Sequence, residues 1–262
     1  MKKTLRRILR KTSEHSFFFK QLVKRDFNQK YKRTVLGMAW SVISPLLTLL
    51  VMRLVFTQFF GRTMEHYTTY LFCGNLVMHY FREATTNGMS SLMGNAGIIT
   101  KINVPKYLFL LSRNVSYLLN FALTLGVFFI FCAIDQITFS WKMILLVYPI
   151  FWLLVLNIGV GLILSGAFVF FRDIQYLYTV FLMLLQYLSA IFYNIDSFSP
   201  TTQKLFMFNP VYVIIRYFRL IVIDRVIPSP EHHSLCAAYA ILTVLIGGLI
   251  YKRMNQKFVY HM

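Results

Sequence analysis

Residues 143–170 read MILLVYPIFWLLVLNIGVGLILSGAFVF, a run without a charged side chain. A helix of about 20 apolar residues crosses the ~30 Å hydrocarbon core of a membrane, so this run predicts a transmembrane helix. The rest of the chain has the same character, because 57% of its 262 residues are hydrophobic and only 14% are charged. A soluble domain could not bury so much apolar surface in one core. We therefore expect an all-α integral membrane protein.

Six apolar segments are candidates for transmembrane helices. The second is interrupted, because its clean apolar part ends at Phe81 and a full crossing must carry Arg82 and Glu83 towards one interface. Since six is an even number, both ends of the chain are expected on the same side. The predicted spans are Val35–Phe60, Tyr67–Leu92, Tyr107–Ile134, Trp141–Phe171, Tyr176–Phe192 and Leu235–Tyr251.

The basic residues indicate how the chain is oriented. The net charge is +18, and the Lys and Arg residues cluster before Val35 and between apolar runs, so they indicate membrane topology and not nucleic-acid binding. Both termini are predicted to be cytoplasmic. The first long apolar run starts only at Val35, which is too late for a cleavable signal peptide. We expect one domain over residues 1–262, with a basic cytoplasmic region at 1–34, a membrane region at 35–251 and a cytoplasmic tail at 252–262.

An amphipathic helix is predicted from Phe17 to Tyr31, ahead of the first span. Its apolar side chains recur every fourth residue, and basic side chains fill other positions. Such a helix lies in the membrane interface with its apolar face towards lipid. The apolar row is Phe19, Val23, Phe27 and Tyr31, and the basic positions include Lys20, Lys24 and Arg25.

A second short helix is predicted from Val211 to Ile223, between the last two spans. At ~20 Å it is too short to cross a membrane, and it contains Arg216 and Arg219. Asn209 and Pro210 precede it, as expected of a helix start. We predict that it is re-entrant or interfacial on the external side, and that it forms a helical hairpin with the segment before it.

The sequence lacks the groups that an enzyme would need. No GxxxxGK[ST] motif is present to hold nucleotide phosphates, and the three cysteines form no CxxC pair. No intramembrane carboxylate pair indicates proton coupling or hydrolysis. We therefore predict no catalytic, cofactor or metal site in this chain, and any ATP hydrolysis should belong to another subunit.

Several local motifs, taken together in order, resemble one transporter family. They are YKRTVLGMAWSVISP at residues 31–45, NAGIITKINVP at 95–105, FRDI at 171–174, and Asn209 with Pro210. This arrangement resembles the permease subunits of ABC-type polysaccharide exporters. That family moves O-antigen, capsular glycan and wall teichoic acid precursors across the bacterial cytoplasmic membrane. The likeness covers nearly the whole chain.

The resemblance implies an assembly and a role for each region. It implies a homodimer bound to two copies of a P-loop subunit, which binds ATP and Mg²⁺, and a channel for a lipid-linked glycan at the permease dimer. Residues Phe17–Tyr31 would form a gate helix among membrane lipids. Residues Asn95–Pro105, the coupling segment, would contact the ATPase, with Asn95, Ile99, Lys101 and Pro105 as candidates. Residues Tyr193–Ile227, including Arg216 and Arg219, would cap the exit.

For the other candidate residues, in the channel and at the ATPase contact, the sequence allows two interpretations each. Trp40, Tyr187, Phe192 and Tyr193 could stack on sugars in a channel, or they could be ordinary packing and interface residues. Arg53 could extend to water at the external interface, or it could face an anionic substrate at the mouth of a channel. Arg172 and Asp173 could form a turn against the ATPase, or a basic loop with a helix cap at Asp173.

Two other functions fit parts of this pattern. An ABC permease for a drug, lipid or small molecule would share the six-span plan. A membrane-embedded glycosyl or acyl transferase would need a catalytic cluster that the sequence does not contain.

Overall fold

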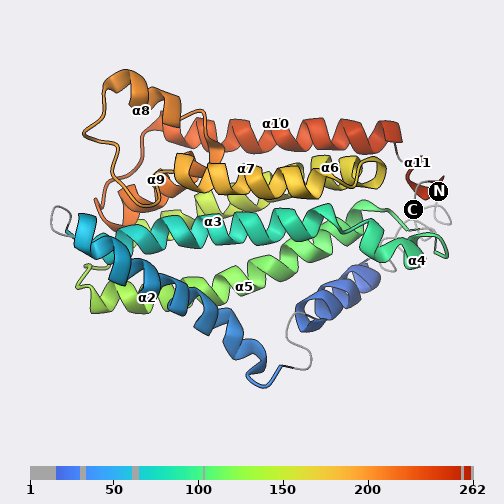
Figure 1. The fold of residues 1–262 in the computed structure, drawn as a ribbon, viewed down its shortest axis with the longest axis horizontal. Coiled ribbons are helices and arrows are strands. Elements are labelled where there is room, and N and C mark those ends of the chain that lie inside the picture. The colour runs from blue at the N-terminus through green and yellow to red at the C-terminus, as the bar shows by residue number, and fades with distance from the viewer. Residues whose placement is uncertain (1–15, 30–33, 61–64, 103, 255–256, 261–262) are drawn as a thin grey trace, which may run out of the picture.

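The computed structural model describes residues 16–29, 34–60, 65–102, 104–254 and 257–260. Every regular element in those ranges is a helix, as predicted. The long helices lie side by side along one axis, with α8 (Pro200–Phe206) projecting at one end and α4 (Ala96–Ile99) at the other (Figure 1). We call these the α8 end and the α4 end. The helix over residues 16–29 and the C-terminal α11 (Lys257–Tyr260) both lie at the α4 end.

The remaining elements follow the predicted segments closely. They are η1 (Gly37–Ala39), α2 (Trp40–Phe60), α3 (Tyr67–Met89), η2 (Met93–Asn95), α5 (Tyr107–Ile134), η3 (Trp141–Leu146), α6 (Val147–Phe170), α7 (Ile174–Leu188), α9 (Pro210–Val222) and α10 (Pro230–Met254). Among the described residues, four stretches are both long and apolar enough to span a membrane: Gly37–Val55, Tyr107–Ile134, Trp141–Phe170 and Pro230–Met254. The chain is therefore a multi-pass membrane protein.

The helices at the predicted second and fifth spans are not both long enough and apolar enough to be counted among these four. α3 is 23 residues long, but its second half carries polar and charged side chains. α7 has 15 residues and ends at Leu188, although the apolar pattern predicted helix up to Phe192. The chain can leave the helix there because distant side chains satisfy its backbone. Tyr67 Oη donates to the Phe192 carbonyl at 2.8 Å, and Arg219 Nη1 donates to the Ala190 carbonyl at 2.9 Å.

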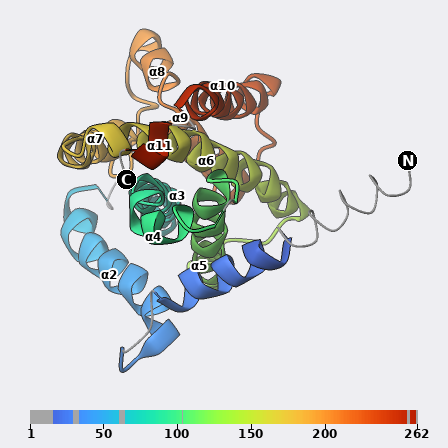
Figure 2. The ribbon, with the colours of Figure 1, turned by 90° about the vertical axis from the view of Figure 1, so that its right-hand side faces the viewer.

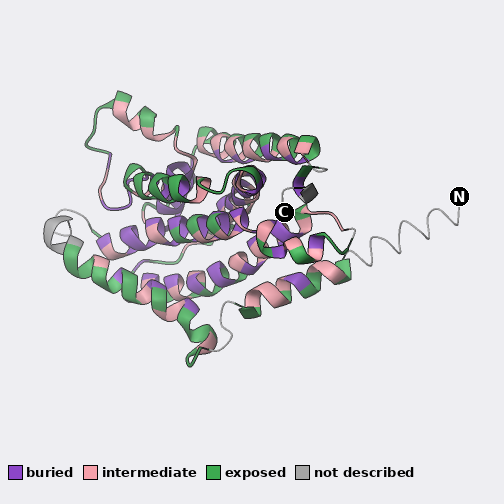
Figure 3. Ribbon diagram, turned by 45° about the vertical axis from the view of Figure 1, so that its right-hand side comes forward, coloured by how far each residue is buried: buried purple, intermediate pink, exposed green. Residues whose placement is uncertain are grey.

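α3 forms the centre of the packing, and α2 lies at its margin. Most α3 side chains are buried (Figure 3), whereas α2 lies at the outside of the bundle in the view along the long axis (Figure 2). On the other side, α6 and α10 pack closely through glycines. A Cβ atom at Gly247 would lie 2.6 Å from Leu162 Cβ, so that position needs glycine for this contact.

α9 is more deeply enclosed than an interfacial helix would be. Nearly all of its side chains are buried, and it packs against α3 and α10. Its start is fixed by Asn209, whose Oδ1 accepts hydrogen bonds from the backbone N–H groups of Val211 and Tyr212 at 3.0 and 3.2 Å. α8 and α9 are bent by 107° relative to each other. Two helices joined by a sharp bend are thus present where the hairpin was predicted, and α9 is the buried one.

Candidate functional site

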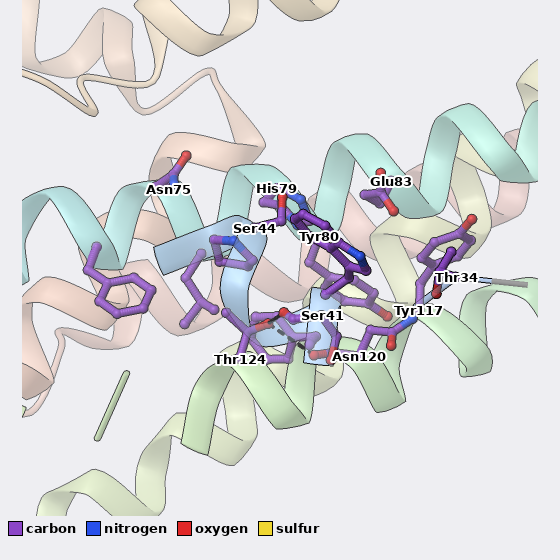
Figure 4. A pocket seen from close by; sticks show the side chains of 15 residues that line it. Thr34, Ser41, Ser44, Asn75, His79, Tyr80, Glu83, Tyr117, Asn120 and Thr124 are labelled. Carbon is purple, nitrogen blue, oxygen red and sulfur yellow. Dashed lines mark hydrogen bonds between the residues drawn. The ribbon is translucent and has the colours of Figure 1, made fainter. Parts of the chain in front are cut away.

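A cavity of about 280 Å³ lies between α2, α3 and α5 (Figure 4). Its lining combines aromatic rings with side chains that carry hydroxyl, amide, imidazole or carboxyl groups. Such a surface can hold a ligand that has both apolar faces and hydrogen-bonding groups. The lining residues are Thr34, Trp40, Ser41, Ser44, Pro45, Phe72, Asn75, Leu76, His79, Tyr80, Glu83, Tyr117, Asn120, Phe121 and Thr124.

Helical spacing brings these polar groups to one place. On α3, Asn75, His79 and Glu83 recur every fourth residue and therefore share a face. On α5, Asn120 and Thr124 are also four residues apart. Thr124 Oγ1 lies within hydrogen-bonding distance of two carbonyl oxygens, that of Ser41 on α2 at 3.3 Å and that of Asn120 at 3.1 Å (Figure 4). The bond to Ser41 ties α2 to α5 at the floor of the cavity.

Two further hollows adjoin this cavity towards the α4 end. One, of about 310 Å³, is lined by Asp26, Gln29, Asn87, Arg113, Ser116, Tyr117 and Asn120. The other, of about 340 Å³, is lined by Arg82, Glu83, Thr86, Asn87, Thr179, Leu182, Met183 and Gln186. Tyr117 and Asn120 belong to the cavity and the first hollow, Glu83 to the cavity and the second, and Asn87 to both hollows. The three spaces therefore adjoin one another around α3, and we call them together the polar tract, after the polar side chains that they share.

The predicted gate helix is present over residues 16–29, and it is attached to α5. Ser112 Oγ donates to Asp26 Oδ2 at 2.7 Å, and Ser116 Oγ lies 3.1 Å from the Val23 carbonyl, to which it can donate. Leu22 is the residue of this helix that is buried. Its attached face therefore differs from the predicted apolar row.

That predicted row is only partly covered in the structure. Phe19, Val23 and Phe27 are half-buried, and Tyr31 lies outside the described residues. Lys20 and Lys24 are exposed. Arg25 is half-buried, and its Nη2 lies 2.6 Å from Asp26 Oδ1, so it is held within its own helix.

The coupling segment presents a different surface from the one expected. Ile99 is only 7% exposed and packs in a cluster with Leu22 and Phe109, so the prediction that it lies at the surface is wrong. Its apolar side chain instead joins the coupling segment to the gate helix and α5. Ile102 is 49% exposed and provides an apolar contact point at the surface.

Of the other residues predicted to contact the ATPase, some are buried and support the segment, and others are exposed at the surface. Asn95 is buried, and its Nδ2 donates to the Ser91 carbonyl at 2.8 Å. Lys101 is exposed and Pro105 is half-buried. Arg172 and Asp173 form an exposed turn between α6 and α7. Asp173 occupies the N-cap position of α7, as predicted, but its side chain makes no capping hydrogen bond to a described residue.

The channel candidates lie in separate places in the single chain, and only Tyr187, Phe192 and Tyr193 are in contact with one another. Trp40 lines the cavity, whereas Arg53 lies farther along α2 and is exposed. Tyr187 is 60% exposed on α7. Phe192 is buried beside it, with the two ring centres 6.0 Å apart, and Tyr193 is half-buried with its Oη donating to the Tyr187 carbonyl at 2.8 Å.

The hairpin residues form the framework of the α8 end. Arg216 pairs with Asp196 at 3.1 Å. Arg219 is buried, with its guanidinium carbon 3.4 Å from the centre of the Tyr70 ring. Asn209 also donates from Nδ2 to the Leu188 carbonyl at 3.1 Å, which joins the ends of α7 and α9. Pro210 occupies the first turn of α9.

Sequence reasoning missed the residues that form the polar tract. Their signal is a polar stripe inside an apolar span, namely Asn75, His79, Glu83 and Asn87 at intervals of four. A polar stripe along a membrane helix must face protein or water, because lipid offers it no hydrogen bonds. Asp26 and Arg113 carry no comparable pattern, and only the packing brings them together.

Helices that span a membrane around a polar tract are typical of transport permeases. The chain belongs to the ABC-2 type transporter family, whose model matches residues 18–223. It is 26% identical to an O-antigen export system permease, RfbA, of Klebsiella pneumoniae, over 90% of this chain and 92% of that protein. It is 22% identical to the RfbA permease of Myxococcus xanthus over 96% and 98%, and 20% identical to the polysialic acid transport protein KpsM of Escherichia coli over 90% and 92%.

Proposed function

We propose that this chain is the transmembrane subunit of an ABC exporter that moves a lipid-linked polysaccharide across the bacterial cytoplasmic membrane. The observation that carries the proposal is the match to O-antigen permeases over nine tenths of both chains. The polysaccharide would be of the O-antigen, capsular or teichoic acid type. The drug or small-molecule permease shares the family but has no such relatives among these matches.

The α4 end is proposed to be cytoplasmic. The described residues there include the exposed basic side chains Lys20, Lys24, Lys101, Arg172 and Lys252, and cytoplasmic segments are enriched in Lys and Arg. With this orientation the α8–α9 hairpin lies at the external exit. If α3 and α7 also cross, with neighbouring helices covering their polar faces, the chain has six spans.

The working unit is proposed to be a homodimer bound to two ATP-binding subunits. The apolar side chains of α2 and α7 remain exposed in the single chain, among them Leu50, Leu54, Val180 and Tyr187. A second copy or lipid must cover them. A channel between two copies would place Arg53 and Tyr187 near its wall. ATP and Mg²⁺ would bind to the partner subunit, which would contact the exposed side of the coupling segment and the Arg172–Asp173 turn.

The polar tract is proposed to receive the leading part of the substrate. Sugars have apolar ring faces and many hydroxyl groups, which suit a lining of Trp40, Tyr80 and Tyr117 with amides and hydroxyls between them. The tract opens beside the gate helix at the membrane interface. A lipid-linked glycan could therefore insert its sugars while its lipid stays in the membrane.

Deletion of the gene in its native host tests this function. We expect surface polysaccharide to be lost and lipid-linked glycan to accumulate on the cytoplasmic side, with both restored by the full chain. The complementing strain should lose surface polysaccharide again when the partner ATPase is made unable to hydrolyse ATP. Normal surface polysaccharide in the deletion strain, together with retention of a drug or small molecule, would refute the proposal and favour the other permease class.

A further inference from the structure

The hollow between the gate helix, α3 and α5 is polar on every side. Each described residue that lines it has a polar side chain, in a protein whose surface is otherwise largely apolar. Its volume is about 310 Å³. The charges of Asp26 and Arg113 and the dipoles of the other side chains would be poorly solvated by an apolar lipid tail and well solvated by a polar headgroup. The contents of this hollow should therefore be polar.

The contacts around the hollow leave it with a positive charge. Asp26 accepts two hydrogen bonds from Arg25, at 2.9 Å from Nε and 2.6 Å from Nη2, so its carboxylate is balanced within its own helix. Arg113 instead donates from Nη1 to two neutral acceptors, the Asn87 carbonyl at 2.9 Å and Ser90 Oγ at 3.0 Å. These contacts hold the guanidinium in place. Asp26 also attracts Arg113 but is shared with Arg25, so the three side chains together keep one net positive charge.

We propose that this hollow binds the phosphate group of a lipid headgroup, with Arg113 as the cation that recognises it. A half-buried guanidinium is suited to phosphate because it is permanently charged and can donate several hydrogen bonds in one plane. Gln29, Ser116 and Asn120 add amide and hydroxyl groups around the same space. Lys20 and Lys24, which the sequence pattern placed among headgroups, do not line the hollow.

The neighbouring cavity indicates which headgroup fits best. Tyr117 and Asn120 line the hollow and also the cavity that Figure 4 shows, so a group attached to a phosphate at Arg113 would extend towards Trp40 and Tyr80. A polyisoprenoid carrier fits this arrangement, with its diphosphate at Arg113 and its sugars in the cavity. The choice of a carrier diphosphate over an ordinary phospholipid rests on the proposed function. The phosphate site itself does not.

Binding can be measured on the full chain in phosphatidylcholine nanodiscs, with farnesyl diphosphate as the probe and tryptophan fluorescence as the signal. Trp40, one of three tryptophans, lines the adjoining cavity. Arg113→Gln should weaken binding by roughly tenfold to a hundredfold, as expected for loss of a charged hydrogen-bond donor. Lys252→Gln removes an exposed charge at the same end, outside the hollow, and should change binding less than about twofold.

A second variant distinguishes a direct loss of binding from misfolding of the protein. Arg113→Gln also weakens the bonds to Asn87 and Ser90, whereas Gln29→Glu adds a negative charge to the hollow at an exposed position. It should weaken binding of the diphosphate by repulsion while leaving the thermal unfolding temperature unchanged. If both variants bind farnesyl diphosphate and phosphatidylglycerol as the wild type does, the proposal is overturned.

The two probes distinguish the source of the phosphate. Sensitivity to Arg113→Gln with farnesyl diphosphate alone supports a carrier headgroup. Sensitivity with phosphatidylglycerol alone supports a phosphate site for membrane phospholipid and removes its link to export. Because neither titration measures export, normal binding in a protein that does not export polysaccharide would refute the proposed function and leave the site in place.

Discussion

Ile102→Ala tests whether the coupling segment meets the ATP-binding subunit through its exposed side. Ile102 is 49% exposed, whereas Ile99, three residues earlier, is 7% exposed. Burying a whole isoleucine side chain contributes up to about 3 kcal/mol, so covering the exposed half of Ile102 should contribute about 1.5 kcal/mol. A loss of that size raises Kd about tenfold. The unfolding temperature should fall only slightly, because about half of the Ile102 side chain is solvent-exposed in the free chain.

The assay is a titration of labelled ATP-binding subunit against the full chain in nanodiscs, with ATP hydrolysis measured in parallel. Ile99→Val is the matched control, since it removes one methyl group from the buried cluster. It should cost about 1 kcal/mol of stability and leave Kd within about twofold. An unchanged Kd for Ile102→Ala would refute the assignment of the contact. Equal losses of affinity in both variants would show that the contact depends on the cluster and not on the exposed side.

Three further predictions concern other parts of the chain. Asn209→Ala should destabilise the α8 end by about 2–3 kcal/mol, because it removes a helix cap and a hydrogen-bond donor to the Leu188 carbonyl. Asn209→Asp keeps the cap, so its loss of stability, measured by thermal unfolding, should be about half as large. Lys20→Gln with Lys24→Gln should weaken the preference of the reconstituted protein for anionic lipids by about 2 kcal/mol but leave polysaccharide export intact, since both side chains are exposed. Abolished export with normal insertion would contradict this. Partial desolvation of the exposed Asp224, together with the neighbouring Asp196, raises the pKa of its carboxyl above the ordinary value. Its contribution to stability is therefore present at low pH and lost as pH rises. Asp224→Asn should raise the unfolding temperature slightly more at pH 7 than at pH 4, and an equal shift at both would refute it.

Arg25 shows why the structure changes the choice of variants. The sequence groups it with Lys20 and Lys24 as an interfacial cation, but its guanidinium balances Asp26. Replacing it would leave that carboxylate without its main cationic partner beside the Ser112 contact that holds the gate helix on α5. A loss of export in an Arg25 variant would therefore report on helix attachment as much as on recognition.

The class of protein and the positions of its helices follow from local properties of the sequence. Apolar length and charge placement are local properties, and a backbone in lipid must satisfy its own hydrogen bonds, so long apolar runs predict helices reliably. The amphipathic helix before the first span and the short helix after Asn209 were predictable for the same reason. Both are present near their expected boundaries.

Which side chains contact one another depends on the tertiary packing and could not be predicted from the sequence. Ile99 and Ile102 are similar residues in one short segment, and only packing against Leu22 and Phe109 buries the first and leaves the second exposed. α7 ends before Phe192 because Tyr67 and Arg219, distant in sequence, satisfy the backbone that follows it. The polar tract likewise joins residues from the gate helix, α3 and α5. Such contacts depend on how helices pack across the bundle, which no local pattern of residues specifies.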